Sequence, residues 1–212
     1  MRALFDTYGA MLGHAILVHT GYVLICVTVG FFLGLLLGVA LSRTPRISGI
    51  VLPVISVLQT IPGLVFIGVL FLWLGMVPMT VIIALSIYAM FPVLKNTYTG
   101  LLGVEQKYLE AAKGCGMSQL QSLLRVELPL AMPSIIAGLR MSAIYTVSWA
   151  VLAAMIGLGG LGGFVYQGTS SNNNTLILLG AIPSALLAVV IGVLVDLLQK
   201  RVVPQGLRKE GS

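Results

Sequence analysis

Charged side chains are scarce in this chain. Asp, Glu, Lys and Arg together make up 8% of its 212 residues, whereas hydrophobic residues make up 58%. Soluble proteins carry about 25% charged residues, so this composition excludes a soluble globular fold. The few charges are also segregated, because residues 7–42, 47–94 and 141–195 contain no Asp, Glu, Lys or Arg. The sequence therefore predicts an integral membrane protein.

Residue types that bind metals and nucleotides are equally few. The two cysteines, Cys26 and Cys115, form no metal-ligand spacing. The chain also lacks the Gly-x-x-x-x-Gly-Lys-Ser/Thr loop that holds nucleotide phosphates. We therefore expect no metal site, no cofactor and no enzymatic activity in this chain, and any energy from ATP must come through a partner.

The uncharged stretches are long enough for several membrane helices, because each span needs about 20 apolar residues. The first stretch holds one span, about residues 19–41, and the second holds two, broken near residues 75–78. The third also holds two, broken by the polar residues 168–175. We therefore predict an all-α, polytopic membrane helix bundle of about five transmembrane helices, forming one domain over residues 1–212. A break at Pro62-Gly63 would raise the number to six.

The basic residues indicate how the helices are oriented. Ten of the twelve Lys and Arg follow the predicted first, third or fifth span; they are Arg43, Arg46, Lys95, Lys107, Lys113, Arg125, Lys200, Arg201, Arg208 and Lys209. By the positive-inside rule these segments are cytoplasmic. The C-terminus is then cytoplasmic and the N-terminus outside, with His14 and His19 expected at the surface near the outer interface. Topology thus explains the net charge of +6, and we expect no nucleic-acid partner.

A polar segment, about residues 105–129, lies between the third and fourth predicted spans. Its main part, residues 110–129, reads EAAKGCGMSQLQSLLRVELP. Glu110 and Lys113 form an i,i+3 pair on a short predicted helix. We expect Ala111 and Ala112 to present a small, smooth surface on this helix, which a partner could approach closely.

A turn and a second helix are predicted to follow. Gly114 and Gly116 supply the turn. The second, amphipathic helix is expected to run from about Ser118, its N-cap, to Val126, with prolines closing the segment before the fourth span. This segment would lie along the membrane and transmit a push from a cytoplasmic partner, although any interfacial helix-turn-helix would look similar.

Two features within the spans point to packing rather than to a ligand site. Gly30, Gly34 and Gly38 are spaced by four residues, so they share one helix face and admit the close approach of another helix. We expect ordinary packing within the chain there, with a subunit interface or a moving contact as the alternative. Arg140, inside the fourth span, is expected to extend toward the cytoplasmic interface rather than to act in gating.

The polar segment resembles a known motif. Glu110-Ala111-Ala112, Gly116 and Leu128-Pro129 are similar to the cytoplasmic coupling motif of binding-protein-dependent ABC importer permeases, from which only Val126, more often Ile in that family, departs. Nearly the whole chain resembles the permeases that import osmoprotectants such as glycine betaine, carnitine and choline. The stretches that carry this second resemblance are residues 58–62, 91–100, 138–140 and 156–162.

The resemblance implies a type I importer in a bacterial cytoplasmic membrane. Two permease subunits, identical or paired with a paralogue, would lie in the lipid, and two cytoplasmic subunits would bind ATP and Mg²⁺. An extracytoplasmic substrate-binding protein would deliver the substrate, and we expect it as a separate chain because nothing follows Ser212. The residues that the resemblance assigns to ATPase coupling are Glu110, Ala111, Ala112, Gly114, Gly116, Leu128 and Pro129.

The same resemblance implies a methylated amine as substrate. Aromatic faces hold quaternary ammonium groups, and the candidates for the translocation pathway are Tyr88, Tyr145 and Trp149, the last two spaced i,i+4. Packing or membrane-interface roles are the alternatives for these rings. A permease for methionine or another small metabolite is the competing function within the class. In other classes the alternatives are a secondary transporter or channel and a non-transporting membrane scaffold.

Overall fold

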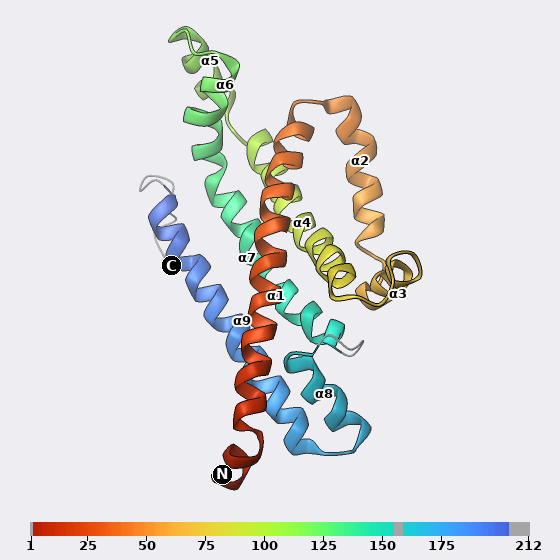
Figure 1. The fold of residues 1–212 in the computed structure, drawn as a ribbon. Coiled ribbons are helices and arrows are strands. Elements are labelled where there is room, and N and C mark those ends of the chain that lie inside the picture. Colours follow the sequence, from red (N-terminus) through yellow and green to blue (C-terminus); the bar gives the residue numbers. More distant parts are fainter. Residues whose placement is uncertain (1, 155–158, 204–212) are drawn as a thin grey trace.

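The computed structural model describes residues 2–154 and 159–203, which form a long helical bundle (Figure 1). Its elements are α1 (Arg2–Ser42), α2 (Pro45–Leu58), α3 (Gly63–Leu74), α4 (Pro78–Leu102), α5 (Gln106–Gly114), α6 (Gln119–Ser122), the π-helical turn η1 (Leu123–Glu127), α7 (Leu128–Ala153), α8 (Leu161–Ser170) and α9 (Asn174–Val202). The predicted all-α fold is confirmed.

Within the described residues, four helices are long and apolar enough to cross a membrane: α1 from Tyr8 onward, α4, the continuous helix Gln119–Ala153, and α9. The pair α2 and α3 passes the same test together but is bent by 98° between them. The break at Pro62-Gly63 is therefore real, yet it does not raise the number of spans to six, because the 14-residue α2 and the 12-residue α3 are each too short to cross alone.

Two predicted boundaries are wrong. The helix α1 begins at Arg2, not near residue 19, because no proline or turn interrupts the residues before it. The fourth span ends at Ala153, well before residues 168–175, and α8 begins at Leu161, within that interval. Gly159 and Gly160, which directly precede α8, have φ of 71° and 81°, a left-handed conformation that glycine adopts without a Cβ clash.

The core forms where α1 and α7 pack against α4. A Cβ at Gly30 would lie 2.7 Å from the Cβ of Ala89, and one at Gly34 would lie 2.6 Å from the carbonyl oxygen of Met90. At Gly38 the corresponding distance is 2.6 Å, to the Cβ of Thr97. The glycine face of α1 thus lies against α4 of the same chain, at a separation that leaves no room for side chains.

His19 lies inside the bundle, contrary to the expectation of a surface position. Its side chain is buried, and Gly160 approaches it so closely that a Cβ there would be 3.4 Å from the imidazole Nδ1. The reason is the extra length of α1, which carries His19 alongside the residues that follow α7. His14 remains exposed.

The two ends of the bundle differ in character. Figure 1 shows α5 and α6 at one end and the N-terminus with α8 at the other. We call residues 103–127 the polar end. Of the basic residues that predict the orientation, Lys107, Lys113 and Arg125 lie in the polar end and Arg43 pairs with it from the end of α1, whereas Arg208 and Lys209 fall outside the described residues.

Candidate coupling site and pathway

The first arm of the polar end is α5. Glu105 precedes it and pairs with Lys107 at 2.6 Å; the hydrogen bond and charge of this carboxylate raise the pKa of Lys107. Glu110, Ala111 and Lys113 are exposed on α5. The prediction that both alanines are presented is wrong for Ala112, which is only 4% exposed, because α5 packs against α6 and η1.

The turn after α5 is closed by glycine. Gly116 has φ of 73°, and its N–H donates to the carbonyl of Lys113 while the N–H of Met117 donates to that of Ala112. This pair of bonds is the Schellman arrangement, which satisfies the last carbonyls of a helix. A Cβ on Gly114 or Gly116 would meet no described atom within 4 Å, so the surface around the turn is open.

The second arm begins as predicted but continues further than predicted. Ser118 is the N-cap of α6, and it exchanges two hydrogen bonds with Gln121 in a capping box. The expected helix end near Val126 is absent, since residues Gln119–Ala153 run as one continuous helix. Pro129 lies in the first turn of α7, one residue beyond Leu128, which follows η1. Proline has no N–H to donate, and the π-helical turn before it can accommodate this missing hydrogen bond.

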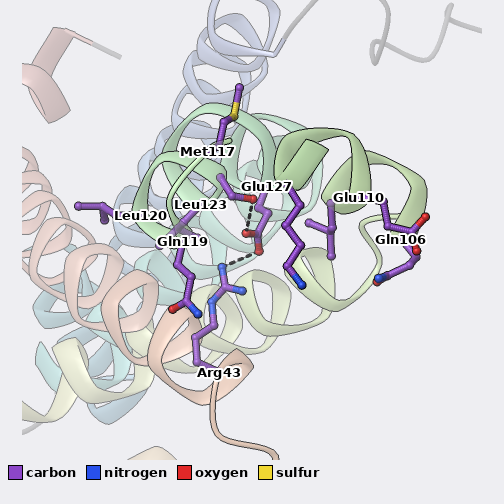
Figure 2. A pocket seen from close by; sticks show the side chains of 11 residues that line it. Arg43, Gln106, Glu110, Met117, Gln119, Leu120, Leu123 and Glu127 are labelled. Atoms are coloured by element: carbon purple, nitrogen blue, oxygen red, sulfur yellow. Dashed lines mark hydrogen bonds and ion pairs between the residues drawn. The ribbon is translucent and has the colours of Figure 1, made fainter. Parts of the chain in front are cut away.

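An open cavity of about 870 Å³ lies between the two arms and the end of α1. Figure 2 shows Glu110 and Gln106 on one side of it and Arg43 beneath Glu127 on the other. Charges of both signs therefore line the cavity. Sequence reasoning missed Arg43 and Glu127 as a pair, because 84 residues separate them and no spacing rule joins them.

Of the three pathway candidates, the structure brings two together. The rings of Tyr88 and Trp149 lie 4.8 Å apart at 35°, and Phe66 and Phe91 contact Tyr88 edge-on at 5.2 and 5.7 Å. Tyr145 is 51% exposed and takes no part in these ring contacts of the described residues. We call Phe66, Tyr88, Phe91 and Trp149 the aromatic cluster.

The aromatic cluster lies against the bend between α2 and α3. The hydroxyl of Tyr88 donates to the carbonyl oxygen of Ile61 at 2.7 Å, within the bend where helical bonding is interrupted. Gly63, at the start of α3, is covered so closely by the ring of Trp149 that a Cβ there would overlap it. The sequence signal for this contact was the Pro62-Gly63 pair, which indicated a break but not the ring that fills it.

Arg140 pairs with an acidic residue of another helix instead of extending alone to an interface. Its Nε lies 2.9 Å from Oδ1 of Asp196 on α9, and both side chains are about half exposed. Charges within a span are costly unless paired. The pair therefore stabilises the contact between α7 and α9.

Comparison with known proteins agrees with this architecture. Solved structures of the MetNI methionine ABC transporter in inward-facing conformations contain a chain with the same fold, with a TM-score of 0.86 over 94% of this chain and 99% of that one, at 19% identity. An amino acid ABC transporter crystallised with histidines gives a TM-score of 0.71 at 18% identity, covering 93% and 96% of the two chains.

Relatives in sequence are more similar. The carnitine transport permease protein OpuCB of Listeria monocytogenes is 39% identical over 201 residues, which cover 93% of this chain and 92% of that protein. The glycine betaine/carnitine/choline transport system permease protein OpuCB of Bacillus subtilis is 37% identical, with coverage of 98% and 96%. The choline transport system permease protein OpuBB of Bacillus subtilis is 36% identical, with coverage of 96% and 94%.

The family assignment rests on one further match. A sequence model of the binding-protein-dependent transport system inner membrane component matches residues 30–205, which include the glycine face of α1, the aromatic cluster and the whole polar end. With the relatives above, this match settles the membership. The chain belongs to the family of inner membrane components of binding-protein-dependent transport systems.

Proposed function

We propose that this chain is the transmembrane permease subunit of an ATP-driven importer for osmoprotectants: glycine betaine, carnitine, choline or related quaternary ammonium compounds. The similarity to permeases named for carnitine, glycine betaine and choline supports the substrate class. The observation that carries the ATP-driven mechanism is the polar end, where an exposed short helix and an open glycine turn project from a continuous membrane helix.

In this proposal the polar end is cytoplasmic and docks a separate ATPase subunit. Glu110, Ala111, Gly114 and Gly116 form the contact surface, because their side chains, or the space around them, are exposed. Ala112 is buried on the other face of α5, which packs against η1, and is assigned to this packing rather than to the contact surface. ATP and Mg²⁺ would act in that partner, and α5 would pass its movement to the bundle.

Leu128 and Pro129 are assigned the junction between the coupling helix and the membrane. Both lie in the first turn of α7, which continues from η1 without a gap. A helix without a break transmits a displacement along its axis as a rigid body. We therefore assign these residues to transmission rather than to contact with the ATPase.

The remaining partners follow from the orientation. With the polar end cytoplasmic, the N-terminus and α8 face outside (Figure 1), where an extracytoplasmic binding protein would deliver the substrate. A second permease subunit, either a copy or a paralogue, would complete the pathway. Its place would be along the exposed apolar faces that this single chain presents, which include Leu72 and Trp73 of α3.

For the pathway we propose Tyr88 and Trp149, together with Tyr145, which lies about one helical turn before Trp149 on α7. Aromatic faces attract a quaternary ammonium group without a carboxylate that would trap it. Tyr88 and Trp149 line the bend between α2 and α3, where backbone carbonyl groups are released from helical bonding. Weak contacts of this kind, made at several points, suit the passage of a substrate rather than its tight binding.

Uptake tests the proposed function. In cells lacking other osmolyte importers, the assembled system is expected to accumulate labelled choline, carnitine or glycine betaine at high osmolarity, in an ATP-dependent manner. Trp149→Ala is expected to slow uptake while ligand binding to the isolated binding protein is unchanged. Uptake of methionine but of no methylated amine would refute the substrate class, and uptake that persists without the ATPase subunit would refute the importer.

A further inference from the structure

A carboxylate is buried where α1 meets the polar end. The side chain of Glu127 is 6% exposed, and it is the one buried Asp, Glu, Lys or Arg among residues 8–154 and 159–203, for which burial is described. Both of its oxygens are occupied: Nη2 of Arg43 lies 2.5 Å from Oε2, and the hydroxyl of Ser122 donates to Oε1 at 3.1 Å. Figure 2 shows the two contacts converging on the carboxylate.

Such a site is costly to build. A carboxylate removed from water must be paired and hydrogen-bonded, and the loss of one partner leaves an uncompensated buried charge. Two exposed ion-pair partners, as in Glu105 and Lys107 at 62% exposure each, contribute far less. Arg43 is 48% exposed, but the carboxylate that it pairs with is buried, so the Arg43–Glu127 pair fixes a geometry that the surface pair does not.

The positions of Glu127 and Arg43 along the chain show which elements this ion pair connects. Glu127 is the last residue of the π-helical turn η1, and α7 starts at the next residue. Arg43 directly follows the last residue of α1. The polar end is joined to α7 through the backbone, whereas this side-chain pair joins it to α1. A π-helical turn inside an otherwise regular helix is a frequent mark of a functional position.

We infer that Glu127 is a positioning residue that ties the end of α1 to the polar end, so that α1 moves together with α5 and α7 when the ATPase changes shape. The inference rests on the proposed function, because it needs a partner that moves the polar end. Ser122 holds the second oxygen and keeps the carboxylate turned toward Arg43. The glycine face of α1 then passes the movement to α4, against which it is packed without intervening side chains.

Two single variants test the tie in proteoliposomes that contain the permease, its ATPase and the binding protein. Glu127→Gln and Arg43→Gln are each expected to keep ATPase binding and ATP hydrolysis. The amount of substrate transported per ATP is expected to fall by about fivefold or more, the lower end of the usual coupling between sites. Arg46→Gln removes the same charge from an exposed side chain nearby and should keep the ratio. If Glu127 only stabilised the fold, the variants would yield less folded permease, but the amount of substrate transported per ATP would be unchanged. This result would overturn the inference.

A covalent replacement of the ion pair gives an independent test. In a background without Cys26 and Cys115, the double variant Arg43→Cys/Glu127→Cys is expected to couple poorly and to recover when a short flexible bismaleimide joins the two thiols. A monofunctional maleimide should restore nothing. Complete cross-linking without recovery would contradict the tie. A failure of the proposed function would look different, because the unsubstituted chain would then bind no ATPase or would transport nothing when ATP is hydrolysed.

Discussion

At the scale of single residues, glycines mark the places where two parts of the chain touch. Gly63 has no side chain because the ring of Trp149 occupies that space, whereas Gly68, on the same helix, would carry a Cβ without meeting any described atom within 4 Å. A comparison of Gly63 with Gly68 therefore separates the need for a small residue at a close contact from the general effect of glycine on a helix. The contact at Gly63 also links the bend between α2 and α3 directly to a proposed pathway residue.

We expect Gly63→Ala to displace the Trp149 ring and to destabilise the permease by about 1–3 kcal/mol, the usual cost of overpacking. Thermal unfolding in detergent and the emission spectrum of Trp149, in a variant without Trp73, measure the two effects. Gly68→Ala is the control: it should leave the Trp149 emission unchanged and should not destabilise the permease, because alanine favours a helix over glycine and meets no described atom there. Equal behaviour of the two variants would show that Gly63 does not set the ring position.

Residue-level patterns also indicate which parts of the structure were predictable. Local signals succeeded: Ser118 was expected to cap a helix and does so, and the break at residues 75–78 is present, with Gly75 in a left-handed conformation at φ 80°. Contacts between distant residues were not predictable. The burial of His19, the pairing of Arg43 with Glu127 and that of Arg140 with Asp196 depend on how helices pack, and no sequence spacing encodes it.

At the scale of elements, the polar end is a short helix, a glycine turn and a second helix, capped by Ser118, that enters the bundle without interruption. The two-helix segment predicted from the sequence is correct in its first half, but its expected end at Val126 and Pro129 is not. Proline was interpreted as a stop, yet in the first turn of a helix it is tolerated. The structural consequence is that a force on α5 reaches α7 through continuous backbone.

The glycine turn gives a prediction at this scale. Gly116→Ala places a Cβ in a left-handed conformation, at a cost of about 1–2 kcal/mol, so we expect a less ordered turn and weaker stimulation of the ATPase by the binding protein. Gly114→Ala is the comparison variant: Gly114 belongs to the same proposed contact surface and has open space around it, but it is helical, so alanine adds a Cβ there without backbone strain. There alanine should favour the helix by up to about 1 kcal/mol.

The measurement for this pair is ATP hydrolysis by the assembled importer with and without the loaded binding protein. Stimulation that falls in Gly116→Ala and persists in Gly114→Ala supports a turn whose conformation matters. If Gly114→Ala loses stimulation as well while binding the ATPase normally, the space around the turn rather than its conformation is what the partner requires. Full stimulation in both variants would contradict the role of the turn.

At the scale of the whole molecule, the account requires that the two ends of the bundle face opposite sides of a membrane. Asn173 caps α9 at the end that carries α8, and Gln119 begins α6 at the polar end. Both side chains are accessible, since Asn173 is partly exposed and Gln119 is exposed. Their separation along the bundle makes them suitable reporters of orientation.

In intact cells, and in a background without Cys26 and Cys115, Asn173→Cys is expected to react with an impermeant maleimide, whereas Gln119→Cys is expected to react only after the membrane is opened. The basic residues at the polar end favour this orientation by the positive-inside rule. Reversed labelling would place the polar end outside and remove it from any cytoplasmic ATPase.

The most direct measurement is site-specific cross-linking between α5 and the ATPase subunit in the assembled importer. In the same cysteine-free background, Ala111→Cys, whose position is exposed, is expected to cross-link to the ATPase, whereas Ala112→Cys, buried one residue further on, is not. The yield at position 111 should also change between the ATP-bound and nucleotide-free states, since the docking surface moves with the partner. If position 111 gives no cross-link in either state while the ATPase remains bound to the permease, α5 is not the coupling helix.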